Sequence, residues 1–99
     1  MYRRTVSVGS RSGLRARPAS LSVQAAARQP VAVTVAREGG DPVDASSMLS
    51  VLALAAQHGD SLVLSAVGYD APDAAEELAV LLSQDGQLLR KDRERKDRA

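Results

Sequence analysis

The sequence contains no cysteine, no tryptophan and no phenylalanine, and only two tyrosines among its 99 residues. Without cysteine the chain can form neither disulfides nor thiolate metal sites, as is usual in a reducing compartment. With so few aromatic side chains, the core must consist of valine, leucine and alanine. No apolar run approaches the length of a membrane span, and the N-terminus lacks the apolar stretch of a signal peptide. We therefore expect one cytoplasmic domain with a single core.

The formal net charge of +1 hides a basic segment near the C-terminus. Positions 90 to 98 hold six basic and three acidic residues, which leaves seven basic and nine acidic residues in the first 89 positions. Segments of mixed charge without aromatic residues are usually solvated and disordered. We expect a folded domain over residues 1–86 and a charged, disordered tail over residues 87–99.

A glycine-containing loop that leads into a helix is the most distinctive feature of the chain. The free amide groups and the dipole at a helix start attract anions, and Pro18 suits a first helical turn because its φ is fixed. Guanidinium groups pair with phosphate oxygens, and the loop supplies Arg11, Arg15 and Arg17 within seven residues. The loop is therefore a predicted anion site, with contacts from Ser12, Ala16 and Arg17.

Hydrophobic periodicity predicts seven elements. Alternating patterns predict strands at 4–8 and 31–36, a short strand with an edge proline is predicted at 42–44, and a mostly apolar central strand at 61–67. Three helices are predicted: one ends near Arg28, one is capped by Ser46 or Ser47 and stopped by Gly59, and one is capped by Asp70 and stopped by Gly86. The first and third helices each show one apolar stripe, formed by Ala19, Val23, Ala26 and Ala27, and by Ala74, Leu78, Leu81 and Leu82. This order predicts an α+β sandwich with the helices on one face of a sheet.

Two motifs together resemble one protein family. The loop sequence Gly-Leu-Arg-Ala-Arg-Pro-Ala at 13–19 is similar to the active-site motif Gly-Leu-His-Ala-Arg-Pro-Ala of HPr, the histidine-containing phosphocarrier protein of the sugar phosphotransferase system, with six of seven positions shared. Residues 45–54, followed by Gly59, resemble the regulatory-serine helix of that family. The resemblance implies an open-faced β-sandwich in the order βαββαβα, with a four-stranded antiparallel sheet covered on one face by three helices.

The family histidine accepts a phosphoryl group from enzyme I and passes it to sugar-specific transporter components, but Arg15 occupies that position here. A neutral imidazole has a lone pair that can attack phosphorus, whereas a guanidinium stays protonated and has none. We therefore expect Arg15 to be incompetent as a phosphoryl acceptor, and the protein to act in partner docking or regulation. The sequence contains no metal-ligand cluster, no nucleophile and base pair and no glycine-rich nucleotide motif, so we expect no cofactor, no metal and no independent enzymatic activity.

Several surface residues have both a structural and a functional interpretation. By resemblance, Ser47 matches a serine that a regulatory kinase phosphorylates, and it is also a plain N-cap. The docking region of the family corresponds to Met48, Leu49 and Leu52, with Leu21 at its rim; the alternative is that these side chains belong to the core. The partners implied are enzyme I and the transporter components, together with a regulatory kinase or transcription factor, and a monomer is expected.

The residues leave two other functions to weigh. A non-enzymatic module could bind anions or nucleic acid through the arginine loop and the basic tail, although the chain lacks stacking aromatic residues. His58 is the only histidine and precedes Gly59 with no arginine nearby in sequence. An isolated histidine needs orienting partners to act in catalysis, so the sequence favours a solvated loop histidine.

Overall fold

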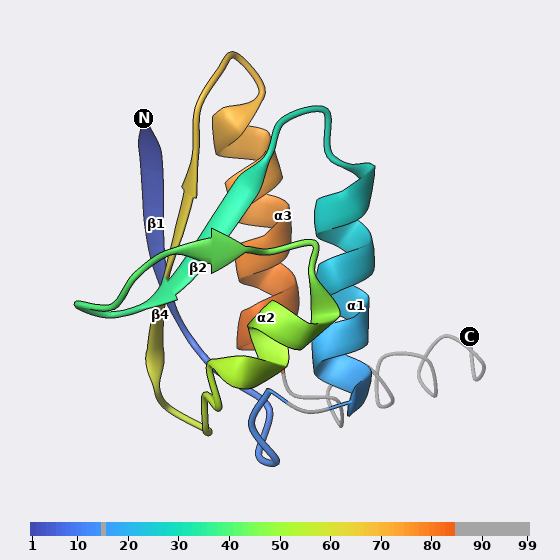
Figure 1. The fold of residues 1–99 in the computed structure, drawn as a ribbon, viewed down its shortest axis with the longest axis vertical. Helices are drawn as coiled ribbons and strands as arrows, with labels where there is room; N and C mark the ends of the chain where they lie inside the picture. Colours follow the sequence, from blue (N-terminus) through green and yellow to red (C-terminus); the bar gives the residue numbers. More distant parts are fainter. Residues whose placement is uncertain (15, 85–99) are drawn as a thin grey trace, which may run out of the picture.

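A four-stranded antiparallel sheet forms one layer of the computed structural model, and three helices form the other (Figure 1). The structure describes residues 1–14 and 16–84, so Arg15, the predicted stop at Gly86 and the predicted tail over 87–99 lie outside it. In chain order the elements are β1 (Tyr2–Ser7), α1 (Ala16–Arg28), β2 (Val33–Arg37), β3 (Val43–Asp44), α2 (Met48–Ala53), β4 (Ser61–Ala66) and α3 (Ala71–Ser83). This confirms the predicted α+β fold and its βαββαβα order.

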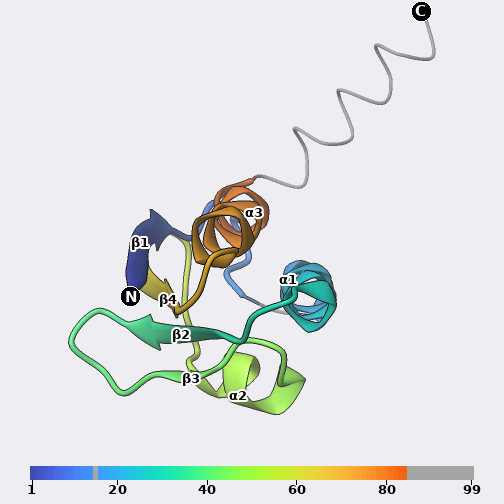
Figure 2. The ribbon, with the colours of Figure 1, turned by 90° about the horizontal axis from the view of Figure 1, so that it is seen from above.

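The strands lie in the order β1-β4-β2-β3, so β4 is an interior strand as its apolar sequence predicts. Val63 of β4 pairs with Thr5 of β1 on one side and with Ala36 of β2 on the other. The two-residue strand β3 forms one edge, where the preceding Pro42 removes no ladder hydrogen bond from the interior. Seen from above, α1 and α3 lie on the same side of the sheet, and α2 lies next to β3 (Figure 2).

The core between the two layers is built from aliphatic side chains, as the composition requires. The largest fully buried side chains are Leu62, Leu64, Leu78 and Val8. Alanines complete it where helix and sheet approach closely; Ala74 and Ala75 of α3 have no exposed surface. The apolar stripe predicted for α3 is confirmed, since Leu82 is also buried and Leu81 packs partly against the core.

The stripe predicted for α1 is partly wrong. Ala19 and Ala26 are buried, but Ala27 is exposed, and Ala25 and Ser22 are buried instead. The reason is that α1 packs against both α2 and α3, which turns its buried face away from the position that apolar spacing alone indicates. A serine tolerates this burial because its hydroxyl donates to the carbonyl of Ala19 at 3.1 Å.

Two predicted helix ends are corrected, while the predicted N-cap position of α3 at Asp70 is confirmed. The second helix ends at Ala53, well before Gly59, because Ala55 adopts a left-handed φ of 52° and turns the chain out of the helix. Asp70 occupies the N-cap position of α3, but its side chain makes no capping hydrogen bond; only its carbonyl accepts from the amide of Ala74. The third helix ends at Ser83, where Gln84 is extended, and so it does not run on to Gly86.

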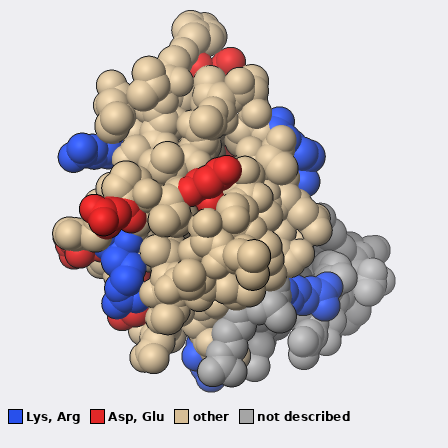
Figure 3. Space-filling view, in the orientation of Figure 1, with Lys and Arg blue, Asp and Glu red and all other residues tan. Residues whose placement is uncertain are grey.

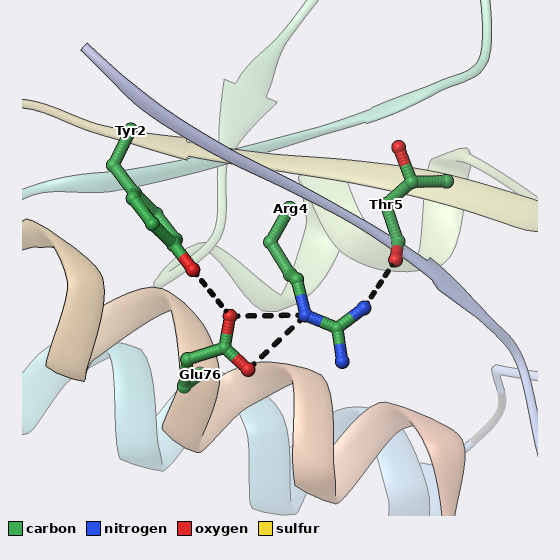
Figure 4. Close-up of polar contacts among 4 residues, drawn as sticks. All are labelled: Tyr2, Arg4, Thr5 and Glu76. Atoms are coloured by element: carbon green, nitrogen blue, oxygen red, sulfur yellow. Dashed lines mark hydrogen bonds and ion pairs between the residues drawn. The ribbon is translucent and has the colours of Figure 1, made fainter.

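A polar cluster joins the edge strand β1 to α3 (Figure 4). The carboxylate of Glu76 accepts a hydrogen bond from the Tyr2 hydroxyl at 2.6 Å and from Nε of Arg4 at 2.9 Å. These two bonds, the Tyr2 hydroxyl first, hold the pKa of Glu76 below its ordinary value. The same hydrogen bond to Glu76 raises the pKa of Tyr2. The cluster fixes the start of the chain on the helical layer.

Candidate functional site

The loop that follows β1 is held against two distant parts of the chain. The amide of Gly9 donates to the carbonyl of Leu82 at the end of α3, and the amide of Leu14 donates to the carbonyl of Ala56, both at 2.9 Å. Gly13 has a φ of +78°, and a Cβ atom there would lie 2.7 Å from the Ala56 carbonyl oxygen. Glycine is therefore required twice, by the backbone conformation and by the close approach of the two segments.

A tight turn at residues 57–60 faces this loop. Its backbone bond runs from the Asp60 amide to the Gln57 carbonyl, and Gly59 takes a φ of +87°, which a turn of this kind needs at its third residue. The Asp60 carboxylate accepts from the Gln57 amide at 2.8 Å. That bond is the main cause that lowers the pKa of Asp60, and the guanidinium of Arg37 adds to it. His58 thus occupies the second position of a turn closed by two hydrogen bonds.

The turn and the loop are tied directly to each other. Val8 donates to the Asp60 carbonyl and accepts from the Gly59 amide, each at 2.9 Å. Arg37, at the end of β2, reaches across with one nitrogen 3.1 Å from the Leu54 carbonyl and another 3.3 Å from the Asp60 carboxylate. Segments far apart in sequence are therefore fixed side by side.

A surface hollow of about 490 Å³ lies between them. It is lined by Arg11, Ser12, Leu14, Leu52, Ala55, Ala56, Gln57 and His58. Ser12, a predicted anion contact, lies on the hollow, and so does His58, which the sequence alone presents as an isolated loop residue. His58 is exposed as expected, but it shares the hollow with Arg11. None of these lining residues carries a carboxylate, so the hollow is suited to an anion.

The other predicted anion contacts lie at the start of α1. Arg17 is exposed in its first turn, and Ala16 is the first residue of the helix. Arg15, the central residue of the prediction, precedes Ala16 and is outside the described residues. Among residues 1–14 and 16–84, no group of histidine, cysteine or acidic side chains could hold a metal ion. No helix in the same part of the chain is long and apolar enough to cross a membrane.

The helix α2 presents apolar residues on both sides. Val51 is buried, whereas Leu49 is 83% exposed and Leu52 37% exposed. Met48 is partly buried against the core, and Leu21 on the neighbouring α1 is 41% exposed. Packing in the core therefore does not explain why α2 has leucine at the exposed positions 49 and 52.

The start of α2 resolves which serine caps it. Ser47 is the N-cap, and its hydroxyl accepts from the Ser50 amide at 3.3 Å. Ser46 instead donates to the Asp44 carboxylate, from its hydroxyl at 2.7 Å and from its amide at 2.9 Å. These two bonds lower the pKa of Asp44. The two neighbouring serines therefore have separate structural roles.

Residues 2–84 match the family described as "PTS HPr component phosphorylation site". The chain belongs to the HPr family. The phosphocarrier protein HPr of Streptomyces coelicolor is 48% identical over 84 residues, which cover 85% of this chain and 90% of that protein. The HPr-like protein Crh of Bacillus subtilis is 35% identical over 85 residues, covering 86% and 99% of the two chains.

Solved structures of HPr show the same fold. The crystal structure of HPr from Bacillus anthracis has a TM-score of 0.76 to this structure, with 33% identity over 82% of this chain and 95% of that one. Family membership confirms the prediction of a phosphocarrier-type protein without independent enzymatic activity. In this HPr-family chain, sequence reasoning missed the contributions of Arg37 and Asp60 and the position of His58. The sequence Gln-His-Gly-Asp at 57–60 was the available signal for the turn, but nothing local indicated what the turn would face.

Proposed function

We propose that this HPr-family protein docks to partners of the phosphotransferase system and carries no phosphoryl group at Arg15. A guanidinium is protonated at any physiological pH and offers no lone pair to phosphorus. Arg15 and Arg17 therefore serve as anion contacts at the start of α1, beside Ser12. The folded domain is proposed to span residues 1–86, followed by a charged tail over 87–99.

The exposure of apolar side chains next to the loop carries this proposal. We call Leu21, Met48, Leu49 and Leu52 the docking patch. The exposed fractions of Leu21, Leu49 and Leu52 are 41%, 83% and 37%. Exposed apolar patches of this kind mark sites of interaction with other proteins. The surface around α2 in Figure 3 is largely uncharged, with charged side chains mainly around its margins.

Enzyme I is the proposed occupant of the docking patch, followed by transporter components, because this is the partner set of the family. A regulatory kinase or transcription factor is a further partner, and Ser47 is the proposed phosphorylation position. Phosphorylation there would place negative charge at the N-terminus of α2, where the helix dipole favours it. We propose that the protein works as a cytoplasmic monomer.

The docking proposal is tested by titrating enzyme I into labelled protein and measuring Kd. Leu49→Asp is expected to weaken binding about tenfold or more, since it introduces a charge into an apolar contact. Val80→Asp is the matched control, because Val80 is 52% exposed but lies on α3. Equal effects of the two substitutions would refute the docking patch. Binding that falls steeply with salt and is lost on truncation at Gly86 would favour the nucleic-acid or anion-binding alternative instead.

The role of Arg15 is tested by incubating the protein with phosphoenolpyruvate and enzyme I and mapping any phosphoryl group by mass spectrometry. Position 15 of the natural chain is expected to stay unmodified. Arg15→His is expected to gain a phosphoryl group at position 15, because it restores a nucleophilic imidazole to the motif. If the Arg15→His variant binds enzyme I and remains unmodified at that position, the missing nucleophile is not what blocks transfer.

A further inference from the structure

The hollow beside the loop contains the only histidine of the chain. The resemblance to the HPr motif implies phosphoryl acceptance at the position of Arg15 and implies nothing for His58. The sequence alone favours a solvated residue, because no arginine precedes or follows it closely. The structure changes this assessment, since Arg11 and Ser12 line the same hollow as the imidazole.

The backbone around His58 is held on both sides. The hydrogen bonds between Val8 and the 59–60 segment, and between Leu14 and Ala56, fix the turn against the loop. Arg37 holds the turn in addition, through Asp60 and Leu54. The imidazole is exposed, so an incoming phosphorus atom can approach it. These contacts fix the backbone that carries the imidazole, on the hollow that Arg11 and Ser12 also line.

We infer that His58 is a phosphoryl acceptor, with Arg11 and Ser12 stabilising the transferred group. The donor is a phosphohistidine of a partner protein, which has a phosphorus–nitrogen bond. A lone pair on a ring nitrogen of His58 attacks phosphorus, and the bond to the donor nitrogen breaks and returns its electron pair to the donor ring. Each imidazole keeps the proton on its second nitrogen, so no oxidant, reductant or additional acid is needed.

The surroundings of His58 fit this step. A neutral imidazole carries a lone pair on one ring nitrogen, and this is the atom that attacks phosphorus. The Arg11 guanidinium offers paired donors to phosphoryl oxygens, and the Ser12 hydroxyl can donate one more. Leu52 belongs both to the hollow and to the docking patch, so a partner seated on the patch would bring its phosphoryl group close to His58. In this respect the inference rests on the proposed function.

A small phosphoryl donor tests His58 without any partner. The protein is treated with potassium phosphoramidate, and the rate of acid-labile phosphorylation is followed by intact mass and mapped by fragmentation. We expect one phosphoryl group on His58, formed at least tenfold faster than on N-acetylhistidine, and no such group in His58→Asn. Arg11→Ala should slow the reaction about tenfold, because it removes charge that stabilises the transition state. Arg3→Ala is the control, since Arg3 is exposed on β1 and does not line the hollow.

A rate equal to that of N-acetylhistidine, or an Arg11→Ala variant as fast as the natural protein, would overturn the inference. A second arm uses phosphoenolpyruvate and enzyme I and asks whether His58→Asn loses phosphorylation that the natural chain shows. The two arms separate the possible failures. Loss of enzyme I binding would refute the proposed docking while the phosphoramidate rates still decide on His58. Intact enzyme I binding with an unreactive His58 refutes this inference alone.

Discussion

Replacing Gly13 by alanine should destabilise the protein more than the same substitution at an unconstrained glycine in a loop. Two separate features of the structure require glycine at this position. Its φ of +78° is a left-handed conformation that side chains disfavour, and an added Cβ would lie 2.7 Å from the Ala56 oxygen and 3.1 Å from the Gln57 Cα. Both neighbours are backbone atoms, so no side chain can rotate away to make room.

The two costs can be separated by magnitude. A left-handed conformation costs a non-glycine residue about 1 to 2 kcal/mol. Overpacking against a fixed neighbour adds about 1 to 3 kcal/mol. Gly39 provides the matched control, because its φ is +81° and a Cβ atom added there would meet no atom within 4 Å apart from those of Gly39 and its two chain neighbours. Gly39→Ala should therefore lose only the conformational part, and Gly13→Ala should lose both.

The measurement is urea unfolding at 25 °C followed by far-ultraviolet circular dichroism, since the chain has no tryptophan for fluorescence. We expect Gly13→Ala to lose about 2 to 5 kcal/mol of unfolding free energy and Gly39→Ala about 1 to 2 kcal/mol. The difference measures how rigidly the loop is pressed on the 56–57 segment. Equal losses in the two variants would show that the segments separate easily, and would remove the argument that the hollow has a fixed shape.

Three further substitutions test individual contacts. Ser47→Ala should cost about 1 kcal/mol in the same urea assay because it removes the cap of α2, and Ser46→Ala should cost less; the reverse order would contradict the assignment of the cap. Glu76→Gln should make the free energy of unfolding depend less on pH on the acidic side. The lowered pKa of Glu76 gives stabilisation that is present above its unfolded pKa and is lost as the pH falls through the folded pKa. An unchanged dependence of stability on acidic pH would argue against the cluster. Arg37→Ala should speed amide hydrogen exchange at Gln57, and unaltered exchange there would mean that Arg37 does not hold the turn.

The fold was predictable because its signals are local and agree with one another. Alternation marked the strands, and turn residues separated them. The helix order and the two motifs pointed to the same architecture. The errors occurred where tertiary contacts override local preference. Helix α1 buries Ser22 because α2 and α3 both pack against it. Helix α2 ends at Ala53 because Ala55 adopts a left-handed conformation that alanine rarely takes. A glycine is the expected helix stop, so the sequence favoured Gly59.

The residues of the candidate site also differ in whether local sequence or only tertiary contacts identify them. Its motif residues were recognisable because Ser12, Ala16 and Arg17 belong to one continuous stretch of sequence. The hollow was not, since Arg11 and His58 come together only through backbone hydrogen bonds between the loop and the turn at 57–60. Judged by its neighbours in sequence, His58 has no arginine beside it; judged by its neighbours in space, it shares a hollow with one. Whether a histidine has charged or polar neighbours depends on the fold. Its part in catalysis can therefore be judged only once the positions of the surrounding segments are known.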